Sequence, residues 1–222
     1  MNDSGFLKLL QALDALFPIG AFTLSNGMET YVQKNLVRDE KTLTDFLDGF
    51  IYLLPFNDLG FAAKAAQGEN FKWLDEICTA SKSSFEIRNG SQKLCARFLK
   101  AENSLGEYPL LRAYSQSIAK RECEGNYSIA IGLFVLDTGM EISRGLEMYC
   151  YSLLSSMVNH AVKLVPLRQL DGQKCLAKVI EKIPYAVKQA LEIETEDLGI
   201  NGAGFDLRSM EHEKLYSRLY IS

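Results

Sequence analysis

The sequence predicts an all-α protein, a single-domain helical bundle of about ten helices that ends in a flexible C-terminal helical tail. Apolar residues recur three and four positions apart along nearly the whole chain, which is the spacing of one helix face. The alternation of apolar and polar residues that is typical of half-buried strands is absent. With 222 residues, 47% of them hydrophobic, the chain can fill one sizeable core. We therefore assign residues 1–222 to one domain, with a body over 1–204 and a tail over 205–222.

The first half of the chain reads as a succession of helices with recognisable ends. Pro18 ends a first helix over residues 6–15, because proline cannot continue a helix. Asp39 is placed to cap the start of another helix with its side chain. Ser83 and Glu86 have the spacing of a capping box at the start of a longer helix.

Two segments in the second half of the chain allow more than one structural interpretation. Residues 125–139 are short and apolar and could form a buried strand by length alone, but no partner strand is in view, so we predict a core helix. Residues 141–164 carry two apolar faces, which places that helix either at the centre of a bundle or against a second subunit. If the second face is a dimer interface, its residues are Met148, Tyr151 and Ser155.

The C-terminal region is predicted to stand apart from the body. The run "EIETEDLGINGAGFD" has four carboxylates within six residues and then three glycines within six, which is typical of a mobile surface connector. Helical spacing returns in residues 205–222. Such a tethered apolar stripe is suited to becoming ordered on a partner.

Composition excludes several classes of function. The net charge is −4 and no long run of lysine or arginine is visible, so we expect no nucleic-acid partner. No apolar stretch approaches the roughly 18 uncharged residues that a membrane span needs. The five cysteines are odd in number and contain no C-x-x-C pair, which indicates reduced core thiols in the cytoplasm and neither a disulfide frame nor a metal site.

No catalytic signature is present, so we predict no catalytic residues, no cofactor and no enzymatic activity. His212 lies between Glu211 and Glu213, a setting that could support acid–base chemistry, although a hydrogen-bonded or partner-contacting histidine is the simpler interpretation. His160 fits a structural role inside its helix. The alternative, a small helical enzyme or a protein that binds an apolar ligand, stays open on His212 and the aromatic-rich interior.

The stretch "FPIGAFTLSNGMETYVQ" is nearly uncharged and lies close to the start of the chain. Pro18 and Gly20 force a turn after the first helix. Thr23 or Ser25 can accept from backbone donors where the next helix begins, and Glu29 lies in an early turn, where the helix dipole favours a carboxylate. Spacing alone takes this segment no further than a helix–turn–helix corner.

At these residues the chain resembles the UreF family of urease accessory proteins. The ending "DLRSMEHEKLYSRLYIS" and the internal "VPLRQLDGQK" resemble the corresponding stretches of that family, so the likeness spans essentially the whole chain. The residues of the opening motif that carry it are Asp14, Pro18, Ile19, Gly20, Phe22, Ser25, Gly27 and Glu29. The residues of the ending that carry it are Asp206, Met210, His212, Glu213, Leu215, Tyr216, Ser217, Arg218, Leu219 and Ser222.

The resemblance implies a homodimeric, all-α protein without turnover. It implies binding to the accessory protein UreH (also called UreD), to the GTPase UreG through that complex, and to apo-urease, into which nickel is inserted. From the tail we expect UreH-type docking through His212, Glu213, Leu215, Tyr216, Arg218 and Leu219, with Tyr216 and Leu219 as anchors. The motif residues Pro18, Gly20, Phe22, Ser25, Gly27 and Glu29 serve either the fold or a partner.

Overall fold

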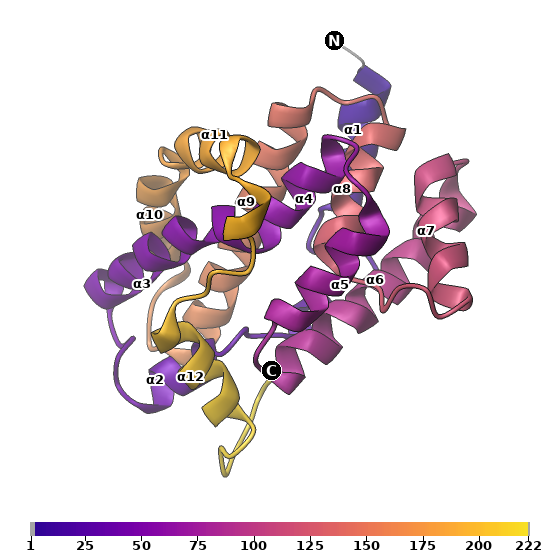
Figure 1. The fold of residues 1–222 in the computed structure, drawn as a ribbon. Coiled ribbons are helices and arrows are strands. Elements are labelled where there is room, and N and C mark those ends of the chain that lie inside the picture. Colours follow the sequence, from indigo (N-terminus) through magenta and orange to yellow (C-terminus); the bar gives the residue numbers. More distant parts are fainter. Residues whose placement is uncertain (1–2, 222) are drawn as a thin grey trace.

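The computed structural model describes residues 3–221, and within that range every regular element is helical (Figure 1), which confirms the predicted fold class. Twelve α-helices and three 3₁₀ turns lie in these residues, somewhat more than predicted. In chain order they are α1 (Asp3–Ala12), η1 (Ala21–Thr23), α2 (Met28–Gln33), α3 (Glu40–Leu53), η2 (Leu54–Phe56), α4 (Asp58–Ala66), α5 (Phe71–Ser81), α6 (Phe85–Leu105), α7 (Pro109–Ala119), α8 (Tyr127–Asp137), α9 (Ile142–Leu164), α10 (Gln169–Ile180), α11 (Ile183–Glu192), η3 (Thr195–Asp197) and α12 (Ala203–His212).

Helix α8 forms the middle of the core. Every residue from 128 to 135 is buried, and α4, α6, α7 and α9 pack around it. The backbones of α4 and α8 approach closely because Gly132 lies against Ala62 and Ala65. The helix predicted over this apolar stretch is therefore confirmed, and the absence of charge from residues 128–135 follows from burial on all sides.

Helix α9 is the longest element and packs against α2, α3, α4, α8, α10 and α11. Its cap is Glu141, whose carboxylate accepts from the backbone N–H groups of Ser143 at 2.9 Å and Arg144 at 3.0 Å. The face that includes Leu154 and Ala161 is buried. This many-sided packing agrees with the bundle-centre alternative for the helix.

Three predicted helix boundaries can be checked directly. Asp39 caps α3 as predicted and accepts from the backbone N–H of Thr42 at 2.8 Å. The capping box at Ser83 is wrong, because the cap of α6 is Ser84, while the Ser83 hydroxyl donates to Asp206 at 3.3 Å. Pro184 is expected to break or kink the helix that follows Asp171. The helix does break there, between Ile180 and Ile183, and the proline lies in the first turn of α11, where its missing N–H costs nothing.

A buried carboxylate fastens α5 to α7 and to the loop before α8. Asp75 is 1% exposed and accepts from the Tyr114 hydroxyl and from the backbone N–H groups of Glu124 at 2.6 Å and Gly125 at 3.1 Å. The side-chain amide of Asn126 donates to the same carboxylate at 3.0 Å. This centre holds the interior of the bundle together.

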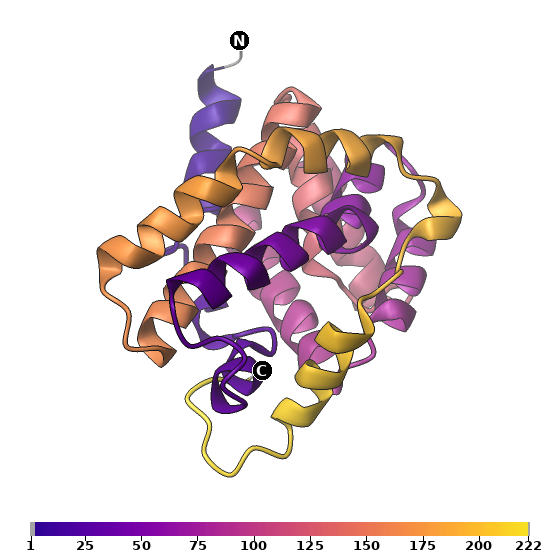
Figure 2. The same cartoon turned by 90° about the vertical axis from the view of Figure 1, so that its left-hand side faces the viewer.

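The acidic, glycine-rich connector lies along the body, where the sequence predicts a segment standing apart. The backbone N–H of Gly199 donates to the Phe56 carbonyl at 2.7 Å, and the side chain of Asn57 donates to the Ile200 carbonyl at 3.0 Å. Asn201 donates in the same way to the Ser81 carbonyl at 2.8 Å. These bonds bring α12 beside α2, at the end of the molecule opposite the start of α1 (Figure 2).

The last helix ends earlier than the sequence predicts, because helical spacing extends over residues 205–222. Helix α12 ends at His212, and residues 213–221 continue as turns without regular structure. Phe205 of α12 packs its ring against those of Tyr31, Phe46 and Phe50. Ser222, which belongs to the family-like ending, lies outside the described residues.

Candidate partner-docking site

Two glycines of the opening motif have backbone conformations that side chains disfavour. Gly20 has φ +78° and Gly27 has φ +80°, both in the left-handed region. A Cβ at Gly27 would lie 2.7 Å from Ser209 Oγ, so this glycine also allows α12 to approach the start of α2. A Cβ at Gly20 would meet the guanidinium of Arg97. The motif glycines therefore shape the fold.

Glu29 connects the opening motif to the end of the chain. Its side chain is buried on the first turn of α2. One carboxylate oxygen accepts from the backbone N–H of Leu219 at 2.8 Å, and the other accepts from that of Tyr220 at 3.1 Å. A carboxylate that satisfies two backbone donors holds a segment without any regular structure.

His212 lies between two carboxylates. Its Nε2 is 3.2 Å from Glu29 Oε2, and its Nδ1 is 2.6 Å from Glu86 Oε2. Each ring nitrogen therefore lies within hydrogen-bond distance of one carboxylate. The guanidinium of Arg218 donates to the other oxygen of Glu86 at 2.6 Å. We call Glu29, Glu86, His212 and Arg218 the tail clamp.

Backbone contacts continue the fastening to the end of the described chain. The side chain of Gln33 donates to the Ser217 carbonyl at 2.9 Å, and the backbone N–H of Ile221 donates to the Thr23 carbonyl at 2.9 Å. Tyr220 is buried, and its ring meets that of His160 edge to face with centroids 4.8 Å apart. Burial, and then the Glu29 charge, raise the pKa of the Tyr220 hydroxyl.

His160 has the structural role predicted for it. The ring is 2% exposed, and its burial, followed by the charge of Lys163, lowers the pKa to about 4. A hydrogen bond with the backbone of Phe22 acts in the opposite direction. Its Nδ1 has no hydrogen-bond partner among the described residues. The neutral ring therefore serves as a platform for Tyr220.

The structure separates the six predicted docking residues into two groups. His212 is fully buried in the tail clamp and cannot touch a partner. Tyr216 is fully exposed and Leu219 is 66% exposed, while Leu215 is half-buried. Glu213 and Arg218 are also exposed, although Arg218 is paired with Glu86.

The remaining candidate residues lie elsewhere. Met148 and Ser155 are half-buried and Tyr151 is 45% exposed, all on α9. Of the opening motif, Ser25 is buried, whereas Pro18 and Phe22 are exposed.

Sequence reasoning missed Glu86, Gln33 and Tyr220 as parts of this site. For Glu86 the sequence offers one indication, its place in the first turn of α6, but a carboxylate there is equally explained by the helix dipole. Nothing in the spacing of Glu86 relates it to a histidine 126 positions later.

No catalytic arrangement forms around the histidines. The ring of His212 is fully buried, with both nitrogens occupied by carboxylates, so a substrate in solution cannot reach it. In residues 3–221, no group of three or more His, Cys, Asp or Glu side chains could hold a metal ion. No helix in that range is long and apolar enough to cross a membrane.

Fold and site together define a class: an all-helical protein whose C-terminal end is fastened to its N-terminal motif and offers exposed apolar side chains. Comparison with known sequences gives the family. A profile of UreF matches residues 37–180. The urease accessory protein UreF of Actinobacillus pleuropneumoniae serotype 5b (strain L20) is 35% identical over 225 residues, covering 96% of this chain and 97% of that protein.

Two further relatives give the same result. The protein of the same name from Haemophilus influenzae (strain PittEE) is 34% identical, covering 96% of this chain and 94% of its own. The protein of the same name from Streptococcus salivarius (strain 57.I) is 30% identical, covering 98% of this chain and 94% of that protein. The chain belongs to the UreF family of urease accessory proteins.

Proposed function

We propose that this protein is a non-enzymatic scaffold of urease maturation. It binds the accessory protein UreH (UreD) and, through that complex, the GTPase UreG, and the assembly enables nickel insertion into apo-urease in the cytoplasm. The name of its relatives, urease accessory protein UreF, supports a role in urease maturation. The individual partners rest on the resemblance of the opening motif and the ending.

One observation carries the docking part of this proposal. Glu29 of the tail clamp holds the backbone of Leu219 and Tyr220, and Gln33 holds that of Ser217. The side chains of Tyr216 and Leu219 are nevertheless exposed. Fixing a segment before it binds removes part of the ordering cost of association. Tyrosine is also enriched among the hot spots of protein interfaces. The segment therefore favours a preorganised docking surface for the UreH-type protein.

Point substitutions test this surface better than deletion of residues 205–222, because Phe205 packs on the body and its removal would expose apolar side chains. We expect Tyr216→Ser together with Leu219→Ser to reduce capture of a purified UreH-type protein at least about tenfold, the loss of one interface hot spot. Tyr185→Ser with Leu170→Ser is the matched control, since both side chains are 64% exposed. Undiminished capture by the tail variant, or an equal loss in the control, contradicts the proposal.

We also propose a homodimer formed through the exposed edge of α9, at Met148, Tyr151 and Ser155. Tyr151 is 45% exposed, and the other two residues, Met148 and Ser155, carry no charge. A charge added to this uncharged surface opposes association. We expect Tyr151→Asp to give monomers by light scattering. Tyr52→Asp on α3, at a side chain that is 65% exposed, is the control and keeps the dimer. A folded Tyr151→Asp protein that is still dimeric refutes this interface.

A further inference from the structure

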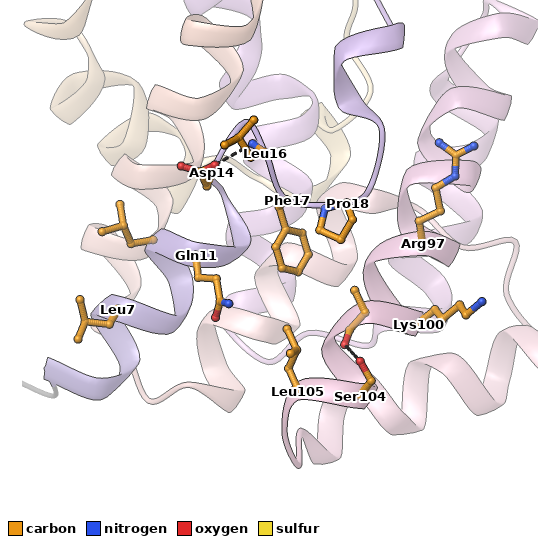
Figure 3. A pocket seen from close by; sticks show the side chains of 12 residues that line it. Leu7, Gln11, Asp14, Leu16, Phe17, Pro18, Arg97, Lys100, Ser104 and Leu105 are labelled. Carbon is orange, nitrogen blue, oxygen red and sulfur yellow. Dashed lines mark hydrogen bonds between the residues drawn. The ribbon is translucent and has the colours of Figure 1, made fainter.

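A hollow of about 990 Å³ lies between α1, the loop after it and the C-terminal half of α6 (Figure 3). We call it the α1–α6 groove. Its floor and rims come from both helices, and Pro18 of the opening motif closes one end. The start of α1 lies at the end of the molecule opposite α12 (Figure 2).

The walls of this groove are apolar and open to solvent. Leu7 is 61% exposed, Leu10 51%, Leu16 91% and Leu105 55%. Four leucines gathered around one hollow differ from the singly scattered apolar side chains that every protein surface carries. Within the described residues nothing covers them.

Positive charge borders the apolar walls on the α6 side. Arg97 and Lys100 line the groove, and Lys93 precedes Arg97 by one helical turn. Neither Lys93 nor Lys100 forms an ion pair with any residue of the described chain. The Arg97 guanidinium donates to the Ile19 carbonyl at 3.0 Å and so has a structural task as well.

Carboxylates offset this charge only in part, since Asp14 is the one carboxylate among the lining residues, against Arg97 and Lys100. Glu102 is buried on α6, and desolvation raises its pKa to about 7 against the opposing effect of Lys8. Asp14 accepts from the backbone N–H of Leu16 at 2.7 Å. A local basic border in a chain of net charge −4 is a specific feature of this surface.

We propose that the α1–α6 groove docks an amphipathic helix of a partner protein, whose apolar stripe is bordered by glutamate or aspartate. Two helices that leave an apolar hollow between them accept a third by helix-in-groove recognition. Carboxylates beside the stripe meet Lys93, Arg97 and Lys100, which fixes the orientation and selects against basic helices. A small ligand is disfavoured, because a side chain as exposed as Leu16 encloses little of it.

The test uses a defined probe, a fluorescein-labelled synthetic peptide about four helical turns long. It has leucines on one stripe and glutamates on both flanks, and a second peptide has lysine in place of every glutamate. Anisotropy is measured with the full chain at about 0.15 M salt, where exposed charges beyond roughly 8 Å are screened. We expect the acidic peptide to bind at least about tenfold more tightly than the basic one.

Variants separate charge from apolar contact. Lys93→Glu with Lys100→Glu is expected to reverse the preference between the two peptides, and it leaves Arg97 and its bond to Ile19 in place. The control, Arg112→Glu on α7 with Lys120→Glu at its C-cap, changes the net charge equally and keeps the preference. Circular dichroism of each variant checks that it is folded.

An apolar variant completes the set. Leu10→Ser is expected to weaken binding of the acidic peptide at least about tenfold, the cost of losing one leucine that the bound peptide would bury. Leu170→Ser on α10 is its control, at an exposed leucine (64%, against 51% for Leu10) that does not line the groove.

Several results would overturn the proposal. These are no binding of either peptide, equal binding of both, or an unchanged preference in the Lys93/Lys100 variant. Groove-dependent binding of laurate or of phosphatidylglycerol vesicles without peptide binding would assign the surface to a lipid instead. The proposal is independent of the tail, because we expect the Tyr216→Ser, Leu219→Ser protein to bind the acidic peptide as the unchanged chain does.

Discussion

Glu29 and Asp75 are both buried carboxylates that accept from two successive backbone N–H groups, but they act in different parts of the molecule. Asp75 holds Glu124 and Gly125, 49 and 50 positions along the chain, and also the Tyr114 hydroxyl. All of its side-chain partners are buried between helices of the core.

Glu29 holds a segment 190 and 191 positions away, at the end of the chain. Its neighbours in the tail clamp include the Arg218–Glu86 pair, of which the arginine is 40% exposed. The segment that follows α12 contributes Tyr220 as its one buried large side chain after His212 within the described residues.

This difference indicates where the molecule can open. Releasing the Asp75 centre requires the core helices to separate, so it belongs to global unfolding. Releasing the tail clamp exposes little apolar surface and leaves the bundle intact, so it belongs to local opening. A docking segment with a low cost of opening can be regulated by its partner, whereas a core centre cannot.

The largest expected effect is at the core centre. Asp75→Ala leaves the Tyr114 hydroxyl and two backbone N–H groups without their acceptor, and each unsatisfied buried donor costs about 1–3 kcal/mol. We expect the free energy of unfolding to fall by about 4 kcal/mol in urea titrations. The control is Asp45→Ala, which removes an exposed pair with Lys41. A change below about 1 kcal/mol would show that the centre is dispensable.

A smaller and local effect is expected at the tail clamp. Glu29→Ala removes the acceptor of Leu219 and Tyr220, so it lowers the local stability of the tail by about 3 kcal/mol. Amide exchange at these two residues should quicken about a hundredfold while the exchange of α8 is little changed. Glu40→Ala, at the start of α3, is the control. Equal acceleration in α8 would mean that the tail and the core open together.

The sequence predicts the regular parts of this fold well, because helices are decided locally. The core helix over residues 127–137 and the cap at Asp39 follow from run length, periodicity and side-chain chemistry. The choice between Ser83 and Ser84 does not, since the two serines are adjacent and the hydroxyl of either has the spacing to accept from a backbone N–H in the first turn of the helix.

The candidate site was predictable only in part. The two family-like ends drew attention to Glu29 and His212, but their contact joins residues 183 positions apart, and periodicity contains no record of such pairs. The glycines and carboxylates of the connector predict mobility from composition, whereas three side-chain and backbone hydrogen bonds to the body depend on tertiary packing. The exposed Tyr216 beside a clamped backbone could be found only in three dimensions.

The smallest expected effect is a pH dependence of folding stability that arises from His160, whose ring packs against Tyr220 at the end of the tail. Its pKa is about 4 in the folded protein and ordinarily 6.5, so the unfolded chain takes up a proton at pH 5 that the folded ring refuses. The stabilisation is complete above pH 6.5 and is lost as pH falls towards 4, by about 2 kcal/mol between pH 7 and pH 5.

Because Tyr220 covers the His160 ring, hydrating that ring in acid requires the end of the tail to move first. We therefore expect amide exchange at Tyr220, corrected for its intrinsic pH dependence, to accelerate between pH 7 and pH 5, while the amides of α8 show a smaller change. His160→Gln removes the titrating group and should flatten the pH profile, whereas Tyr220→Phe keeps the ring contact and should preserve the profile. If His160→Gln retains the full pH dependence, another group controls the acid response and the tail end is not the part of the molecule that acid opens first.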